Sequence, residues 1–142
     1  MESVKRCLEK FPPVFFTFIT LGVILWLTLA PKPLGDNAPS LFPGADKIVH
    51  GIMFGFFTIM MILDWQRGHN WNDAGWPKTM VAILISTTLG VVIEVAQLNM
   101  NLGRGFEWED MIADGVGAIT CGVIYELMIR RKTSQTHNDG TR

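Results

Sequence analysis

Side chains that can bind a ligand or transfer a proton gather in three segments, each beside a long apolar run. They are, in chain order, Asp46, Lys47, His50, Glu94, Gln97, Arg104, Asp110 and Asp114. Carboxylates and imidazoles serve as general acids and bases and as metal ligands, whereas lysine and arginine bind anions. Which chemistry applies depends on whether the segments meet, and so on the elements that carry them.

The composition indicates a membrane protein rather than a soluble domain. Of the 142 residues, 49% are hydrophobic and 18% are charged, whereas about 25% are charged in soluble domains. Runs without Asp, Glu, Lys or Arg, apart from Asp114, occupy residues 11–31, 48–63, 79–93 and 111–125. With a few polar residues at each end, each run approaches the roughly 20 residues that cross a bilayer.

The sequence therefore predicts an all-α membrane protein, a bundle of four transmembrane helices at about 12–30, 46–64, 78–98 and 110–130. These helices make one domain, residues 1–130, and the polar residues 131–142 are predicted to be a disordered tail. The apolar core of the first helix is longer than that of a secretory signal, which favours an uncleaved anchor.

The basic residues predict the orientation of the helices. All but three of the 12 lysine and arginine residues fall on one side of the membrane, and the exceptions are Lys32, Lys47 and Arg104. Because basic residues collect on the cytoplasmic side, both termini and the loop at 65–77 are predicted to be cytoplasmic. The three polar segments then face outward.

In this arrangement three helices bring polar groups to the same outer rim. Residues four apart share a helix face and lie one turn apart. The expected layers are Asp46, Gln97 and Asp110 near the surface, and His50, Glu94 and Asp114 one turn deeper. A charge at mid-membrane depth costs about 2.5–3.5 kcal/mol on insertion scales, so these groups should face one another or a wet cavity. They form either a ligand site or a hydrogen-bonded knot that only fixes helix packing.

The charges at the rim leave the kind of ligand open. Two helix N-termini point at the rim and favour anions, and Lys47 and Arg104 add positive charge. The nearby acids outnumber these cations, so burial keeps some acids neutral, or the acids pair with the cations, or a divalent metal ion lies among them. The candidate ligands for a metal are His50, Glu94, Asp110 and Asp114, whose spacing matches no known zinc signature.

Small residues four apart predict close packing of the helices. Gly51 and Gly55 form one such pair, and Ala113, Gly117 and Cys121 form a second series. This spacing lets two backbones approach closely, within one chain or between two copies, so a homo-oligomer is also an expectation.

The segments LFPGADKIVHGIMFGFF, IEVAQ and GRGFEWEDMIADGVGA together resemble the VanZ-like family. That family's approximate pattern is Pro, then Asp-Lys-x-x-His with an aromatic residue four positions on, Glu-x-x-Gln, Arg, and Asp-x-x-x-Asn-x-x-Gly. The matching positions are Pro43, Asp46, Lys47, His50, Phe54, Glu94, Gln97, Arg104, Asp110 and Gly117. Asp114 departs from the pattern, because the family usually has Asn there. The resemblance implies a small bacterial membrane protein of the cell envelope, and the founding members lower sensitivity to the lipoglycopeptide teicoplanin.

Two functions fit the residues and the resemblance. In the first, a non-enzymatic plasma-membrane protein binds an amphipathic anionic ligand on its outer face, either a lipid-linked cell-wall precursor or a lipoglycopeptide. The expected binding residues are Asp46, Lys47, Gln97, Arg104 and Asp114. In the second, an embedded enzyme modifies or hydrolyses such a precursor, with Glu94, His50 and Asp110 as catalytic residues. Nucleic acid is not an expected partner, because the basic C-terminal cluster suits topology or anionic lipid.

Overall fold

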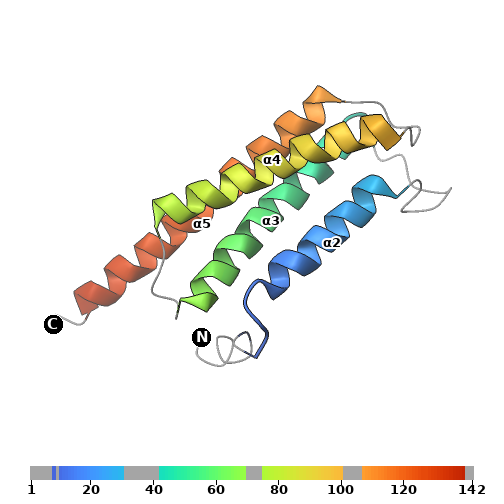
Figure 1. Cartoon of the computed structure of the whole chain (residues 1–142). Helices are drawn as coiled ribbons and strands as arrows, with labels where there is room; N and C mark the ends of the chain where they lie inside the picture. The colour runs from blue at the N-terminus through green and yellow to red at the C-terminus, as the bar shows by residue number, and fades with distance from the viewer. Residues whose placement is uncertain (1–7, 9, 31–41, 70–74, 101–106, 140–142) are drawn as a thin grey trace.

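The computed structural model describes residues 8, 10–30, 42–69, 75–100 and 107–139, and their side chains as far as residue 131. The helices in these ranges are α2 (Phe15–Leu29), α3 (Ala45–Gly68), α4 (Trp76–Met100) and α5 (Trp108–Asp139). No strand occurs within the described ranges. Figure 1 shows the four helices side by side, with α3 between α2 and α5. The predicted all-α fold is confirmed.

Three of the helices are long and apolar enough to cross a membrane. They are α3, α4 and the part of α5 from Trp108 to Arg131. Helix α2 has 15 residues, about 22 Å at 1.5 Å per residue, which is short of the roughly 30 Å of hydrocarbon. Of the four predicted helices, three thus have the length and composition to span a membrane, and the first is an apolar helix shorter than that.

The first helix is shorter than predicted because of its N-terminal boundary. Its predicted start at residue 12 falls on Pro12, and the ring of Pro13 disfavours a helical backbone at the residue before it. Val14 then adopts a left-handed conformation with φ 64°, which regular helix excludes. The helix consequently begins only at Phe15.

Helix α5 runs past the end that the sequence predicted. It continues to Asp139 rather than stopping at 130, because neither proline nor glycine interrupts residues 131–139. Most of the predicted disordered tail thus lies in a helix, and residues 140–142 lie outside the described residues.

Polar residues lie inside the bundle and large apolar residues lie outside. In the described part of the chain, the buried polar residues outnumber the buried apolar ones and include Thr28, His50, Asp64, Glu94 and Glu126. The exposed face of every helix carries large apolar side chains, such as Phe18, Ile52, Leu84 and Ile119. This distribution suits a bundle surrounded by lipid, because lipid solvates apolar side chains and excludes unpaired charges.

Glycines allow α3 and α5 to touch through their backbones. A Cβ atom at Gly117 would overlap the backbone of Gly51, and one at Gly55 would lie 2.5 Å from Cys121 Sγ. The close packing predicted from these small residues is thus confirmed within one chain. A larger residue at Gly117 would force the two helices apart.

We predict that Gly117→Ala destabilises the protein by about 1–3 kcal/mol, the usual cost of overpacking. The added methyl group meets backbone atoms of α3, which cannot rotate away. Thermal unfolding in detergent measures the effect. Gly22→Ala in α2 is the matched control, because nothing lies within 4 Å of a Cβ atom there. Equal melting temperatures for the two variants would contradict the close contact.

Asp64 of α3 forms an ion pair within its own helix and ties that helix to α2 at the end of the bundle where α2 begins. Asp64 accepts hydrogen bonds from Thr17 N at 2.8 Å, from Thr17 Oγ1 at 2.9 Å and from Arg67 Nη1 at 2.5 Å. Arg67 Nη2 in turn donates to the carbonyl oxygens of Leu8 and Phe11. The sequence analysis did not select Asp64 or Arg67, although their i, i+3 spacing is a typical signal of a helix ion pair.

We predict that Asp64→Ala destabilises the protein by about 3–5 kcal/mol, because it leaves the buried Arg67 charge unpaired. Unfolding by SDS titration from mixed micelles measures this change. The double variant Asp64→Ala, Arg67→Met should recover part of the stability, since it removes the unpaired charge. A double variant as unstable as the single one would show that the ion pair is not the cause.

Candidate functional site

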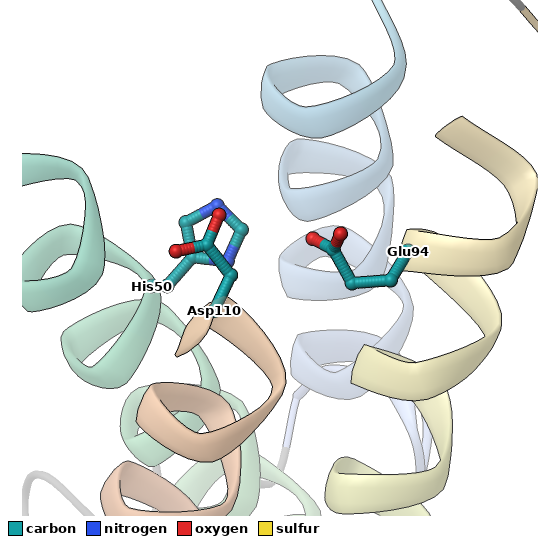
Figure 2. A group of neighbouring side chains, drawn as sticks. All are labelled: His50, Glu94 and Asp110. Atoms are coloured by element: carbon teal, nitrogen blue, oxygen red, sulfur yellow. The ribbon is translucent and has the colours of Figure 1, made fainter. Parts of the chain in front are cut away.

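Three helix ends meet at the other end of the bundle, where α3 begins, α4 ends and α5 begins (Figure 1). Each contributes one buried titratable side chain: His50, Glu94 and Asp110, which are 8%, 1% and 7% exposed. One nitrogen or oxygen atom from each lies within 4.8 Å of the others. Figure 2 shows the carboxyl group of Glu94 directed from α4 towards His50 of α3 and Asp110 of α5. The predicted convergence of the three helices is therefore observed.

A second contact orients the His50 ring. His50 Nδ1 lies 3.1 Å from Asp114 Oδ1, one turn further along α5, and both side chains are buried. Gly90 of α4 makes room for this carboxyl group, because a Cβ atom there would lie 2.5 Å from Asp114 Oδ2. With the proton on Nδ1, the ring donates to Asp114 and keeps the lone pair of Nε2 for another partner.

Only one oxygen of the Glu94 carboxyl group is hydrogen-bonded. Glu94 Oε2 accepts from the backbone N–H of Glu107 at 3.1 Å, which places the start of α5 against α4. Glu94 Oε1 is buried and has no hydrogen-bond partner among the described residues. A buried polar atom without a partner costs about 1–3 kcal/mol, and more if charged. Proteins retain such atoms at sites where a ligand supplies the missing donor or cation.

Lys47 forms ion pairs with four acids at the rim. Its Nζ lies 2.7 Å from Glu107, 3.2 Å from Glu109, and 3.3 Å from both Asp46 and Asp110. Asp46 in α3, and Glu109 and Asp110 in α5, stand in the first turns of their helices, where the helix dipole favours negative charge. Asp110 belongs both to this cluster and to the group around Glu94.

Two of the predicted site residues are not seen in the site. One contacts a different helix, and the other lies outside the described residues. Gln97 Nε2 donates to the backbone carbonyl of Thr28 at 2.9 Å, so this side chain ties α4 to α2. Arg104, a predicted anion-binding residue, lies outside the described residues. Glu107 was not among the predicted site residues. Its side chain pairs with Lys47 and its backbone holds Glu94.

One cavity in the described part of the bundle lies away from the polar cluster. It measures about 290 Å³ and is lined mainly by apolar side chains of α2, α3 and α4, including Met61, Ala82 and Ile85. Asp64 and Thr17 also line it, which places it at the end opposite to His50. None of the predicted site residues lines this cavity, so its size says nothing about the chemistry at the rim.

A family model described as VanZ/LLP1 matches residues 11–129 of this chain. The chain belongs to the VanZ/LLP1 family. The resemblance inferred from the three motifs is thus confirmed, and the match includes α2, α3, α4, the membrane-crossing part of α5 up to residue 129, and every predicted site residue. Neither the curated proteins nor the solved structures contain a match to the chain.

We predict that Lys47→Met lowers the melting temperature of this VanZ/LLP1 protein, because the four carboxylates around Nζ then repel one another. The loss should be largest at low ionic strength and smaller in salt, which screens these partly exposed charges. Thermal unfolding at two salt concentrations measures it, with Lys10→Met as the control because Lys10 is exposed. A loss that does not depend on salt would contradict this explanation.

Proposed function

We propose that this VanZ/LLP1 protein resides in the bacterial plasma membrane and binds the polar head of an amphipathic anionic lipid at its outer face. The expected ligand is a lipid-linked cell-wall precursor or a lipoglycopeptide. The observation that carries the proposal is the buried Glu94 Oε1, which has no hydrogen-bond partner among the described residues, at the rim where α3 and α5 begin and α4 ends. A ligand entering from the membrane surface reaches this position without crossing the bilayer.

The site offers complementary contacts for both parts of such a head group. Lys47 Nζ, with a quarter of its side chain exposed, is placed to meet a phosphate or carboxylate. Glu94 Oε1 and Asp110 accept hydrogen bonds, so they suit the hydroxyl and amide groups of sugars and peptides. Outside the bundle, exposed apolar residues near the same end, such as Ile48 and Ile52, face the region that a lipid tail occupies.

The orientation of the site rests on the distribution of basic residues. Of the basic residues with described side chains, Lys47 lies at the His50 end, and the others lie towards the opposite end: Lys10, Arg67, Lys78, Arg130 and Arg131. Basic residues favour the cytoplasmic side, so the end with Glu94 is assigned to the outer surface. Lowered sensitivity to teicoplanin would follow if the protein sequesters either the antibiotic or the precursor that the antibiotic binds.

One observation favours a second candidate function, an enzyme that hydrolyses a lipid-linked precursor. Asp114 orients His50, and Glu94 presents a free oxygen within reach of the same space. A carboxylate that orients a histidine beside a second acid is the arrangement of many general acid and base catalysts. In this function His50 or Glu94 takes a proton from water while Asp110 lies beside the reacting group.

We predict that geranylgeranyl phosphate, a short prenyl phosphate, binds to the wild-type protein and at least tenfold more weakly to Glu94→Gln. Native mass spectrometry of protein released from mild detergent measures both. Glu126→Gln is the matched control, because Glu126 is equally buried in α5 but both its oxygens have partners, Thr79 and Arg130. Equal binding by all three proteins would refute a role for Glu94.

The same samples separate binding from catalysis. An enzyme releases inorganic phosphate from the prenyl phosphate over time, and Glu94→Gln abolishes the release. A binding protein leaves the bound mass unchanged in wild type and variant alike.

A further inference from the structure

We propose that His50, Glu94 and Asp110 together hold a divalent metal ion, and that this ion meets the anionic part of the ligand. The inference rests on the proposed function, because the ion lies in the same site. The three side chains come from three helices, and their ligand atoms lie within 4.8 Å of one another. Figure 2 shows Glu94 facing the other two across the space between them.

The donor set indicates which ions fit. One imidazole nitrogen and two carboxylate oxygens are ligands of Zn²⁺ and of Mn²⁺, whereas Ca²⁺ and Mg²⁺ are bound mainly by oxygen. Three protein ligands also leave at least one coordination position for another molecule, as in catalytic rather than structural zinc sites. A phosphate oxygen or a water molecule occupies that position.

A second group contacts each proposed metal ligand at an atom other than the one that would bind the metal. Asp114 holds His50 through Nδ1, the backbone N–H of Glu107 holds Glu94 through Oε2, and Lys47 holds Asp110 through Oδ1. His50 Nε2 and Glu94 Oε1 are left for the ion, and Oε1 has no hydrogen-bond partner among the described residues. Partners of this kind orient the ligands of protein metal sites and tune their affinity.

A neighbouring acidic group provides the contrast. Asp46, Glu107 and Asp110 also place carboxylate oxygens close enough for a metal. Lys47 Nζ already lies among these carboxylates, 2.7–3.3 Å away, and supplies the positive charge they need. In the buried group with Glu94, Lys47 contacts only Asp110, and no described lysine or arginine contacts His50 or Glu94. A cation is therefore expected there and not beside Asp46.

The ion would also offset the repulsion between the buried acids and an anionic ligand. The acids Glu94, Asp110 and Asp114 are buried, and Lys47, the described lysine that contacts Asp110, is shared among four carboxylates. Lys47 can meet an anionic head group at the rim, but the three buried carboxylates repel an anion that approaches His50. A divalent cation lowers the local negative charge and at the same time attracts phosphate, as metal ions do in phosphoryl-transfer sites.

Isothermal titration of the full-length, EDTA-treated protein in lipid nanodiscs tests the inference, with ZnCl₂ and MnCl₂ as the probes. We expect about one ion to bind per chain, and at least tenfold weaker binding to Glu94→Gln and to His50→Gln. Glu126→Gln is the control and should bind like the wild type. Size-exclusion profiles and helix content verify that the variants are folded. Failure of both metals to bind, or equal binding by every variant, overturns the inference.

Repeating the titration with geranylgeranyl phosphate separates this inference from the proposed function. Metal-dependent binding of the prenyl phosphate, lost in EDTA, supports both. Metal binding without any binding of the prenyl phosphate supports the metal site and refutes the proposed ligand class. Binding of the prenyl phosphate that is equally strong in EDTA refutes the metal site and leaves the proposed function standing.

Discussion

The backbone contact between Gly51 of α3 and Gly117 of α5 is the constraint on which the polar site depends. Gly51 follows His50 directly, and Gly117 lies nearly one turn beyond Asp114. A closer approach than larger residues allow brings the imidazole within hydrogen-bond distance of the carboxyl group. Gly90 makes the corresponding space on α4, so Glu94, one turn further along α4, reaches the same region.

The buried carboxyl groups at the two ends of the bundle differ in how fully they are hydrogen-bonded. Near the start of α2, Asp64 receives three hydrogen bonds and pairs with Arg67. These contacts compensate for the loss of water, and the result is a tie between α2 and α3. At the other end, the carboxyl group of Glu94 is only half satisfied. Incomplete pairing destabilises a fold, which is why such atoms mark binding sites more often than structural ties.

Much of the fold and of the site could be predicted from particular residues. The apolar runs gave α3, α4 and α5, and the i, i+4 spacing placed Asp46 over His50 and Asp110 over Asp114. Two helix boundaries differ from the prediction. The left-handed backbone of Val14 delays the start of α2 to Phe15, and α5 continues to Asp139. Gln97 shares a face with Glu94 in the sequence pattern, yet it bonds to Thr28 of α2, a contact that spacing along one helix does not reveal.

The sequence by itself determined that three long apolar helices exist and that their polar residues collect at one level, because hydropathy and helical periodicity are local properties of the chain. Only the tertiary structure decided which polar atoms meet. The rotation and separation of the helices determine three features of the site. These are the pairing of His50 with Asp114, the hydrogen bond from the Glu107 backbone to Glu94, and the lack of a described partner for Glu94 Oε1. Those are set by contacts between residues far apart in sequence, such as Gly51 and Gly117.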